Sequence, residues 1–305
     1  MARNYLSVDD LTPGELRALF DLSAKVKADP SAYGARLAGR SIALVFEKPS
    51  TRTRVSFEVG VAELGAHPLV ISSSELQLGR GETIEDTGRV LSRYVQAIAA
   101  HLRAGASRAA GLHVLRARHQ LALDFEHPCQ ALADLFTIRE RLGGLQGRTL
   151  AYLGDGNNVA HSLLLGGAKT GMHVRIATPP GFEPIPQVVN RAAEIAAENG
   201  GTVQTLHDPG EAAEGADALY TDVWASMGRE DEADERALVF PAYQLNQKLL
   251  DLADPRAIVM HCLPAHRGQE ITDEVIDGPR SAVWDQAENR LHTQKALLLT
   301  LFEAI

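Results

Sequence analysis

The sequence is poor in cysteine: its 305 residues include two, Cys129 and Cys262. Two cysteines make no disulfide framework, and neither belongs to a Cys-x-x-Cys pair of the kind that binds zinc, so we expect reduced thiols. No apolar run approaches the roughly 18 residues that a membrane span needs. The stretch from Met1 to Leu6 also lacks the long apolar segment of a signal peptide. We therefore expect no membrane association and a cytoplasmic location.

The sequence has fewer basic than acidic residues, 30 lysines and arginines and 39 aspartates and glutamates, which gives a net charge of −9. This balance disfavours non-specific binding to nucleic acid, which needs a basic surface. It does not exclude a small anionic substrate, since a local arginine cluster at a helix start can hold a phosphate in an acidic protein. Internal repeats are absent too. The length predicts two domains of about 150 residues each.

Short apolar runs alternate with helical patterns along the chain, which is typical of an α/β fold with mostly parallel sheets. The expected strands are residues 41–46, 68–71, 148–153, 174–177, 202–204, 218–221 and 257–260, and the expected helices include 127–142, 187–198 and 289–303. We predict two doubly wound domains, residues 1–135 completed by 289–305 and residues 136–288. The C-terminal helix is expected to pack back on the first domain.

The first motif with chemical meaning is Ser50-Thr51-Arg52-Thr53-Arg54, directly after the first strand and its short loop. Hydroxyls and free backbone N–H groups at a helix start form a cradle for an anion, and Arg52 can add forked hydrogen bonds to phosphate oxygens. The alternative interpretation is an ordinary capped helix with two solvated arginines. Spacing alone does not separate the two.

The second motif is His127-Pro128-Cys129-Gln130. A histidine held before a proline can donate a hydrogen bond to a developing oxyanion, and Gln130 can bond a planar amide-like group. The alternative is a histidine that caps a helix or lies in the core, which is the commoner role of a lone histidine.

The third motif is the stretch from His261 to Gly268, sequence HCLPAHRG, after the last strand. Pro264 ends that strand and exposes the carbonyls of Cys262 and Leu263 at its carboxyl end, although Cys262 also fits the role of a small buried hydrophobe. Histidines beside a cysteine suggest a metal. No carboxylate or second cysteine lies at ligand spacing along the chain, so we predict no metal.

Two further stretches follow strands. Asp222 offers a carboxylate for an ammonium group, and the sequence then runs through Ser226-Met227-Gly228. Gly154-Asp155-Gly156-Asn157-Asn158 is similar to a dinucleotide-binding loop but lacks the third glycine, so we predict no nicotinamide cofactor.

Together these motifs resemble the carbamoyltransferase family over nearly the whole chain, and its ornithine branch closely. The marks that carry the resemblance are residues 50–54, residues 127–130, Asp222 with Ser226-Met227-Gly228, and residues 261–268. The aspartate branch shares the first two motifs but lacks the last two. The acetylornithine branch departs already at the phosphate loop.

The resemblance implies a carbamoyl-phosphate domain followed by an ornithine domain, a trimer or a multiple of trimers, and no metal or organic cofactor. It implies catalytic roles for Arg52, His127, Asp222 and Cys262. It places carbamoyl phosphate at Ser50, Thr51, Arg52, Thr53, His127, Pro128, Cys129, Gln130, Cys262, Leu263 and Arg290, with Gln77 reaching a neighbouring subunit's site. It places ornithine at Asn158, Asp222, Ser226 and Met227.

One stretch departs from the family pattern. Where the family has Arg-Thr-Phe-Gly, whose arginine binds carbamoyl phosphate, this chain has His101-Leu102-Arg103-Ala104-Gly105-Ala106. Where the family has a buried strand of the type Val-Pro-Val-Ile-Asn, this chain has Arg116-Ala117-Arg118-His119-Gln120. Three basic residues in that stretch do not suit an inner strand, because inner strands are apolar and burying a charged group is costly.

A shift of reading frame accounts for both departures. The codons CGC ACC TTC GGG CAG GAG CG encode Arg-Thr-Phe-Gly-Gln-Glu, and from the third nucleotide they encode residues 101–106 of this chain. The same displacement turns C GTG CCC GTC ATC AA, for Val-Pro-Val-Ile-Asn, into residues 116–120. We therefore hypothesise that residues from about 101 to 120 are out of frame, through a sequencing error or a compensated pair of shifts. If the protein carries this segment, one phosphate-binding arginine is missing, and a catalytically impaired or inactive paralogue becomes the alternative function.

Overall fold

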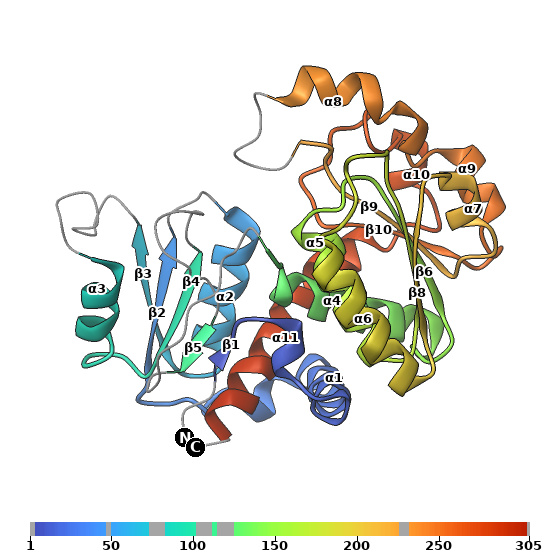
Figure 1. Ribbon diagram of the computed structural model, residues 1–305. Helices are drawn as coiled ribbons and strands as arrows, with labels where there is room; N and C mark the ends of the chain where they lie inside the picture. Colours follow the sequence, from blue (N-terminus) through green and yellow to red (C-terminus); the bar gives the residue numbers. More distant parts are fainter. Residues whose placement is uncertain are drawn as a thin grey trace. The chain divides into compact units, whose positions relative to one another are not determined.

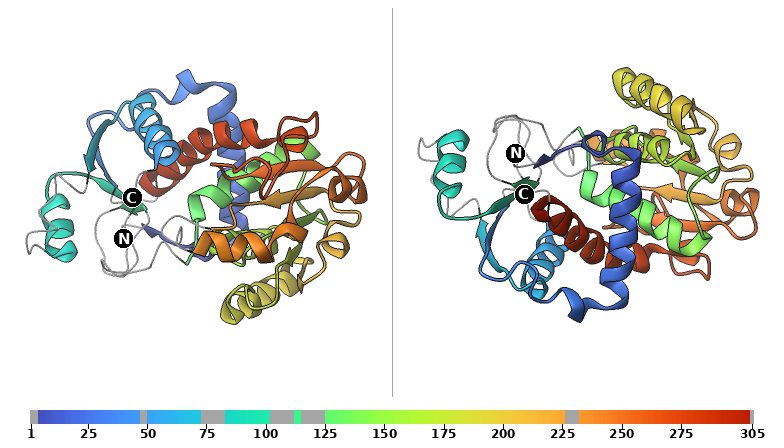
Figure 2. Two further views of the ribbon diagram at one scale, coloured as in Figure 1. Left: turned by 90° about the horizontal axis from the view of Figure 1, so that it is seen from above. Right: turned by 90° about the horizontal axis from the view of Figure 1, so that it is seen from below.

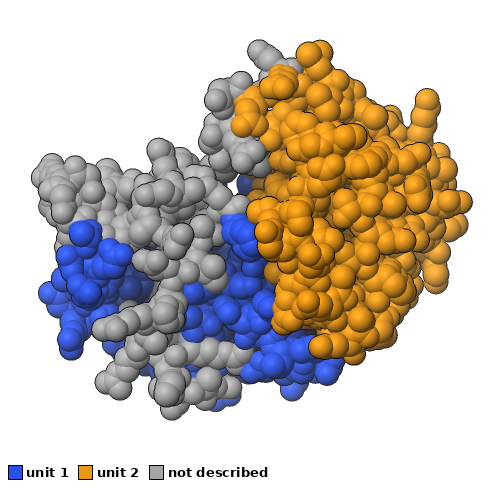
Figure 3. All heavy atoms as spheres, viewed as in Figure 1, with its two compact units in different colours: residues 1–129, 290–305 blue, residues 130–289 orange. Residues whose placement is uncertain are grey.

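A computed structural model of the chain describes residues 4–46, 50–72, 83–101, 112–114, 125–225 and 232–303. The chain folds as two compact units, one of residues 1–129 with 290–305 and one of residues 130–289 (Figure 3). We call them unit 1 and unit 2. Each contains one five-stranded sheet, so the predicted α/β class with mostly parallel sheets is confirmed. Most of the segment assigned to a frame shift, residues 102–111 and 115–120, lies outside the described residues.

The sheet of unit 1 has the strand order β1-β5-β4-β2-β3. Its strands are β1 (Asn4–Tyr5), β2 (Ser41–Phe46), β3 (His67–Ser72), β4 (Ala97–His101) and β5 (Leu112–Val114). The central strand β2 is parallel to β3 and to β4, whereas β5 is antiparallel to both β4 and β1. The sequence predicted the bounds of β2, and its four central residues are buried, as expected for an inner strand. It did not predict β1, β4 or β5.

The helices of unit 1 are α1 (Pro13–Ala28), α2 (Thr51–Glu63) and α3 (Ile84–Leu91), together with short 3-10 turns at Val8–Asp10 and Pro30–Tyr33. Helix α1 begins with a reciprocal capping box between Thr12 and Glu15, followed by Pro13 in the first turn. Helix α2 follows β2 and packs beside β2 and β3. Its start is thereby fixed at the carboxyl end of a buried strand.

The C-terminal helix α11 (Val283–Glu303) contributes its second part to unit 1. Lys295, fully buried, donates to Glu63 Oε2 over 2.6 Å, and its side chain would lie 3.2 Å from a Cβ added at Gly60. Farther along, the Arg40 guanidinium lies 4.5 Å from the centre of the Phe302 ring. Within unit 1, α11 therefore runs alongside α2 (Figure 2). This confirms the predicted return of the C-terminal helix to the first domain.

The sheet of unit 2 is parallel throughout, with the order β10-β9-β6-β7-β8. Its strands are β6 (Thr149–Leu153), β7 (His173–Ala177), β8 (Thr202–Leu206), β9 (Ala218–Thr221) and β10 (Ile258–His261). Every residue of β9 and β10 is buried, because helices cover both faces of the sheet. Helices α5 and α6 lie on one face, and α7, α9 and α10 lie on the other (Figure 1).

The helices of unit 2 are α4 (Pro128–Leu142), whose first residues belong to unit 1, α5 (Asn158–Lys169), α6 (Pro186–Asn199), α7 (Pro209–Ala213), α8 (Ala233–Val239), α9 (Gln247–Leu252) and α10 (Asp273–Ile276), with a 3-10 turn at Pro241–Tyr243. The chain thus passes between the units within α4 and again within α11. Among the helices that the structure describes, none has both the length and the apolar composition of a membrane span.

Candidate active site

Helix α2 of unit 1 begins without a side-chain cap. Ser50 occupies the cap position, but among the described residues its hydroxyl accepts no hydrogen bond from the first turn. The first turn of an α-helix leaves backbone N–H groups without partners inside the helix, and the helix dipole makes this end electropositive. An anion is the ligand that satisfies both features. The structure therefore favours the anion-binding interpretation of Ser50 and Thr51 over that of a capped helix.

Arg52 adds a guanidinium to the same helix start. Its Nε is buried and has no hydrogen-bond partner among the described residues. A buried N–H group without an acceptor costs about 1–3 kcal/mol. A phosphate oxygen is an acceptor that removes this cost and matches the forked geometry of the guanidinium.

A second guanidinium reaches α2 from α11. Arg290 is 3% exposed, and its Nη2 donates to the hydroxyl of Thr53 over 2.5 Å. Thr53 is itself buried in the first turn of α2. Unit 1 thus brings two arginines, 238 positions apart in sequence (290 − 52), to one helix start. Two fixed positive charges beside free N–H groups suit a dianionic phosphate.

The motif of residues 127–130 forms the start of α4. The carbonyl of Pro128 accepts a hydrogen bond from the Tyr5 hydroxyl over 3.3 Å, which ties this start to the N-terminal strand. Gln130 is buried, and its Nε2 donates to Asp134 Oδ1 one turn later, over 2.8 Å. That bond fixes the plane of the Gln130 amide. His127, half-buried, directly precedes the helix.

Cys129 lies in the same turn and near Arg290. Burial raises the pKa of the Cys129 thiol to about 11, and the positive charge of Arg290 acts in the opposite direction without offsetting it. The thiol is therefore neutral at neutral pH, and a neutral thiol is a poor nucleophile. Cys129 contributes volume and a weak dipole to the helix start, not a thiolate.

This pKa predicts how the thiol reacts. In a Cys262→Ser variant Cys129 is the remaining cysteine, and we expect its alkylation by iodoacetamide to accelerate about tenfold per pH unit from pH 7 to 10. The urea-unfolded chain should instead level off near pH 9. Because the folded pKa is raised, the folded state holds its proton more tightly, so this group's contribution to stability is present below pH 9 and is lost as the pH rises to about 11. A plateau of the folded rate below pH 9 would contradict the assignment.

In unit 2 the strand order assembles the second half of the candidate site. Loops that follow β6, β9 and β10 emerge at the carboxyl edge of the parallel sheet, where α/β proteins bind ligands. Strand β9 lies between β10 and β6. Asp222, the first residue after β9, is thereby placed between Cys262 after β10 and the loop that follows β6.

The Asp222 carboxylate accepts hydrogen bonds at both of its oxygens. Its Oδ1 accepts from the Cys262 thiol over 2.8 Å and from the backbone N–H of Val223 over 2.8 Å. Its Oδ2 accepts from Asn157 Nδ2 over 2.9 Å. The carboxylate is 5% exposed, so its orientation is set by these bonds and not by solvent. Asp222 and Cys262, two of the predicted site residues, are thus in direct contact.

Asn157 keeps its own orientation through the helix that follows. Its Oδ1 caps α5 by accepting from the N–H groups of Val159 and Ala160, and it also accepts from the Tyr152 hydroxyl over 3.3 Å. Its Nδ2 is then directed to Asp222. Sequence reasoning chose the next residue, Asn158, which is the first residue of α5, and missed Asn157. The signal for Asn157 was its cap position before the helix.

A second pair of buried groups fixes the loop after β10. His261 Nδ1 accepts from the N–H of Leu263 over 2.8 Å, so the ring proton is on Nε2 and donates to Glu270 Oε1 over 3.1 Å. His261 and Glu270 are both buried. The backbone of Leu263 is held at φ +58°, a left-handed conformation that costs of order 1–3 kcal/mol for a non-glycine residue. Sequence reasoning did not single out Glu270.

Asp222, His261 and Cys262 each offer a metal-ligand atom, and these atoms lie within 4.8 Å of one another. The sequence argument against a metal assumed that a carboxylate had to be near in sequence, and this was wrong, because Asp222 arrives from the neighbouring strand. Both ring nitrogens of His261 and the thiol of Cys262 already take part in hydrogen bonds within unit 2.

Three of the predicted site residues, Gln77, Ser226 and Met227, lie outside the described residues. The others are distributed between the units. Unit 1 contains the start of α2, residues 127–129 and Arg290. Unit 2 contains Gln130, Asn158, Asp222, Cys262 and Leu263.

The two units correspond to two known family domains. Residues 3–140 match the carbamoyl-phosphate-binding domain of aspartate/ornithine carbamoyltransferase, and residues 146–301 match its aspartate/ornithine-binding domain. The chain belongs to the aspartate/ornithine carbamoyltransferase family. The family prediction made from the motifs is confirmed.

Relatives place the chain within the ornithine branch of the carbamoyltransferases. It is 60% identical to the ornithine carbamoyltransferase of Parafrankia sp. over 307 residues, which covers 99% of this chain and 96% of that protein. It is 56% identical to the ornithine carbamoyltransferase of Acidothermus cellulolyticus, covering 100% and 98%. The solved ornithine carbamoyltransferase of Pyrococcus furiosus superposes with a TM-score of 0.91 at 48% identity, covering 100% of this chain and 98% of that one.

Proposed function

We propose that this protein transfers the carbamoyl group of carbamoyl phosphate to the side-chain amine of L-ornithine, producing L-citrulline and phosphate for arginine biosynthesis. The proposal rests on the presence of two features in one chain, a helix start suited to phosphate and a carboxylate suited to an amine. Unit 1 has an uncapped helix start with the guanidinium groups of Arg52 and Arg290. Unit 2 has a carboxylate bonded to a thiol at the carboxyl edge of its sheet.

We assign carbamoyl phosphate to a domain of residues 1–135 completed by 289–305, and ornithine to residues 136–288. The phosphate is held by the start of α2 and by Arg290. We assign the carbamoyl group to the start of α4. The proposed carbamoyl-phosphate residues are Ser50, Thr51, Arg52, Thr53, Gln77, His127, Pro128, Cys129, Gln130, Cys262, Leu263 and Arg290, and the proposed ornithine residues are Asn158, Asp222, Ser226 and Met227.

The mechanism begins with the amine. An alkyl amine has a pKa near 10, so it has to lose a proton before it attacks. Asp222 and Cys262 orient the nitrogen. Their own side chains are joined by the hydrogen bond from the Cys262 thiol to Asp222 Oδ1. Attack on the carbamoyl carbon produces a tetrahedral oxyanion, which Arg52, Thr53 and His127 stabilise as hydrogen-bond donors. The C–O bond to phosphate then breaks, and the departing phosphate accepts a proton.

Holding the two substrates side by side supplies a large part of the rate acceleration of such a transfer, because a bimolecular encounter is replaced by a reaction between oriented groups. The proposed roles therefore need no group beyond the side chains and the two substrates. We further propose a cytoplasmic homotrimer or a multiple of trimers, in which Gln77 reaches the site of a neighbouring subunit.

We further propose that the segment from His101 to Gln120 lowers the activity of this exact sequence. Without the arginine of the family's Arg-Thr-Phe-Gly stretch, one phosphate contact is lost, so we propose that the chain binds carbamoyl phosphate more weakly than a family member with that arginine. Resequencing the gene across this stretch tests the frame hypothesis. An uninterrupted frame that encodes these residues removes the explanation by sequencing error.

The functional test is a citrulline assay on two proteins, this exact sequence and the same gene read continuously in the family frame. We expect the second protein to have a KM for carbamoyl phosphate that is lower by about 10- to 100-fold, the loss that one charge-assisted contact causes. Equal kinetics for the two proteins would refute the importance of the segment. Absence of citrulline from this sequence alone would favour the inactive paralogue, and absence from both would refute the proposed function.

A further inference from the structure

Arg236, on α8 of unit 2, is a buried charge that the proposed mechanism leaves without a role. It is 2% exposed, and burying an arginine is unfavourable unless its donors are bonded. Its Nη1 donates to Asp155 Oδ2 over 2.8 Å and to the Trp224 carbonyl over 2.6 Å. Its Nε donates to Glu232 Oε2 over 2.9 Å.

Aromatic rings fix the guanidinium further. Its carbon lies 5.0 Å from the centre of the Phe182 ring and 5.7 Å from that of Phe240. The indole of Trp224 stacks on Phe240 with ring centres 6.0 Å apart. A planar cation that both donates in a fork and faces rings has one fixed pose, which a lysine cannot reproduce.

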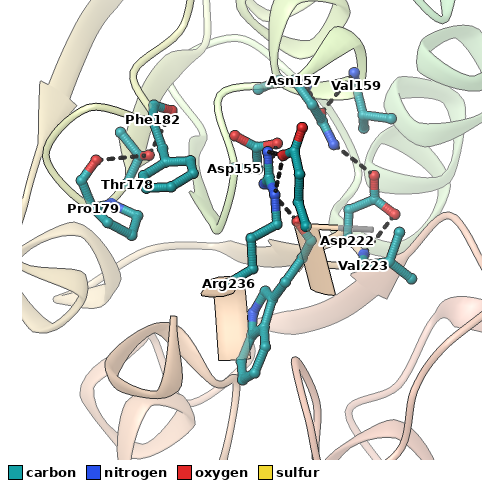
Figure 4. Close-up of polar contacts among 12 residues, drawn as sticks. Asp155, Asn157, Val159, Thr178, Pro179, Phe182, Asp222, Val223 and Arg236 are labelled. Atoms are coloured by element: carbon teal, nitrogen blue, oxygen red, sulfur yellow. Dashed lines mark hydrogen bonds and ion pairs between the residues drawn. The ribbon is translucent and has the colours of Figure 1, made fainter. Parts of the chain in front are cut away.

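The two groups that Arg236 joins each stand two residues from one partner of the hydrogen bond between Asn157 and Asp222 (Figure 4). Trp224 follows Asp222 by two positions, and Asp155 precedes Asn157 by two positions. Asn157 in turn donates to Asp222. Arg236 therefore closes a ring of contacts: from its guanidinium through Trp224 to Asp222, across to Asn157, and back through Asp155.

We propose that Arg236 is a positioning residue for ornithine, which holds the loops after β6 and β9 at the separation that the bond between Asn157 and Asp222 requires. This inference rests on the proposed function. Arg236 acts through Asp155 and the Trp224 carbonyl and does not itself contact the substrate. Its loss lets the two loops separate, so the Asp222 carboxylate no longer has one orientation.

The matched control is Arg148, at the opposite edge of the same sheet. Arg148 also joins an aspartate and a carbonyl: its Nη1 donates to Asp217 Oδ1 and its Nη2 donates to the Leu142 carbonyl, each over 2.8 Å. Arg148 directly precedes β6 and Asp217 directly precedes β9. The two arginines thus tie the same pair of strands at their two ends, and only Arg236 ties the end that carries Asp222.

The test compares Arg236→Gln, Arg236→Lys, Asp155→Asn and Arg148→Gln in the full-length protein. We expect Arg236→Gln to raise the KM for ornithine by about 10- to 100-fold, as small displacements of positioned groups do, with the KM for carbamoyl phosphate changed less than about twofold. Arg236→Lys should recover part of the loss. Asp155→Asn should raise the same KM, and combining it with Arg236→Gln should add little, because both break one chain of contacts.

Arg148→Gln is expected to lower thermal stability without changing the KM for ornithine. The proposal is overturned if the folded Arg236→Gln protein keeps its ornithine KM, or if Arg148→Gln raises it equally. If Arg236→Gln does not fold, Asp155→Asn alone decides. Calorimetric titration of each protein with L-ornithine separates failure of this proposal from failure of the proposed function. If the Arg236→Gln protein binds ornithine as tightly as the parent protein, the role of Arg236 is refuted. If the parent protein binds ornithine but forms no citrulline, the proposed reaction is refuted.

Discussion

Replacing Arg52 by alanine should lower kcat/KM for carbamoyl phosphate by about 1,000-fold, which is the expected loss of two charge-assisted hydrogen bonds to phosphate. The side chain has a buried Nε that no described protein group satisfies. Its removal therefore breaks no hydrogen bond between that atom and a described residue, and the thermal midpoint should not fall. The effect should be confined to carbamoyl phosphate, with calorimetric binding of ornithine unchanged.

The control for this experiment lies two residues away. Arg54 is on the same first turn but is exposed, and its partner is Glu58, with 3.6 Å between Nε and Oε2. An exposed pair of this kind contributes well under about 1 kcal/mol. Arg54→Ala should therefore leave every kinetic constant within about twofold. Equal losses in the two variants would show that general positive charge, and not the pose of Arg52, accounts for phosphate binding.

Replacing Asp222 by asparagine should lower kcat/KM for ornithine by about 1,000-fold. The change removes a buried negative charge and places one hydrogen-bond donor, the new NH2 group, against another donor. One oxygen becomes an NH2 group, which faces either the Cys262 thiol or Asn157 Nδ2. Asn157 cannot turn its oxygen to the new donor, because that oxygen caps α5. The variant thus loses either the contact to Asp222 or the helix cap.

Steady-state kinetics with each substrate varied in turn checks this expectation. The control is Asp217→Asn, at the other end of β9, where Asp217 accepts from Arg148 and from the N–H of Thr149. It should cost stability and leave the KM for ornithine unchanged. An Asp222→Asn enzyme with ornithine kinetics within about fivefold of the parent would remove Asp222 from the proposed mechanism.

Local signals were sufficient to predict most strands and the family. The run at residues 41–46 is β2 with the same bounds, since an apolar stretch between polar residues fits a buried parallel strand. Helix α11 begins at Val283, six positions before the predicted Asn289, because the polar residues of its first turns gave no cap signal. Strand β5 was missed because it has three residues and lies within the aberrant segment, residues 101–120. Strands β1 and β4 were missed as well.

Contacts between distant residues explain what the sequence could not reveal about the candidate site. Asp222 and Asn157 are 65 positions apart, and Arg236 and Asp155 are 81 apart. Their proximity follows from the strand order β10-β9-β6, which no local pattern encodes. The same reason explains why the metal argument, based on spacing along the chain, overlooked the Asp222 carboxylate.

The proposed carbamoyl transfer can be followed with 13C-carbamoyl phosphate in a reaction of this exact sequence with L-ornithine. We expect citrulline labelled at its side-chain carbamoyl carbon, one phosphate for each citrulline, and little or no product when putrescine or aspartate replaces ornithine. Release of phosphate without labelled citrulline, or preferential labelling of putrescine or aspartate, would contradict it.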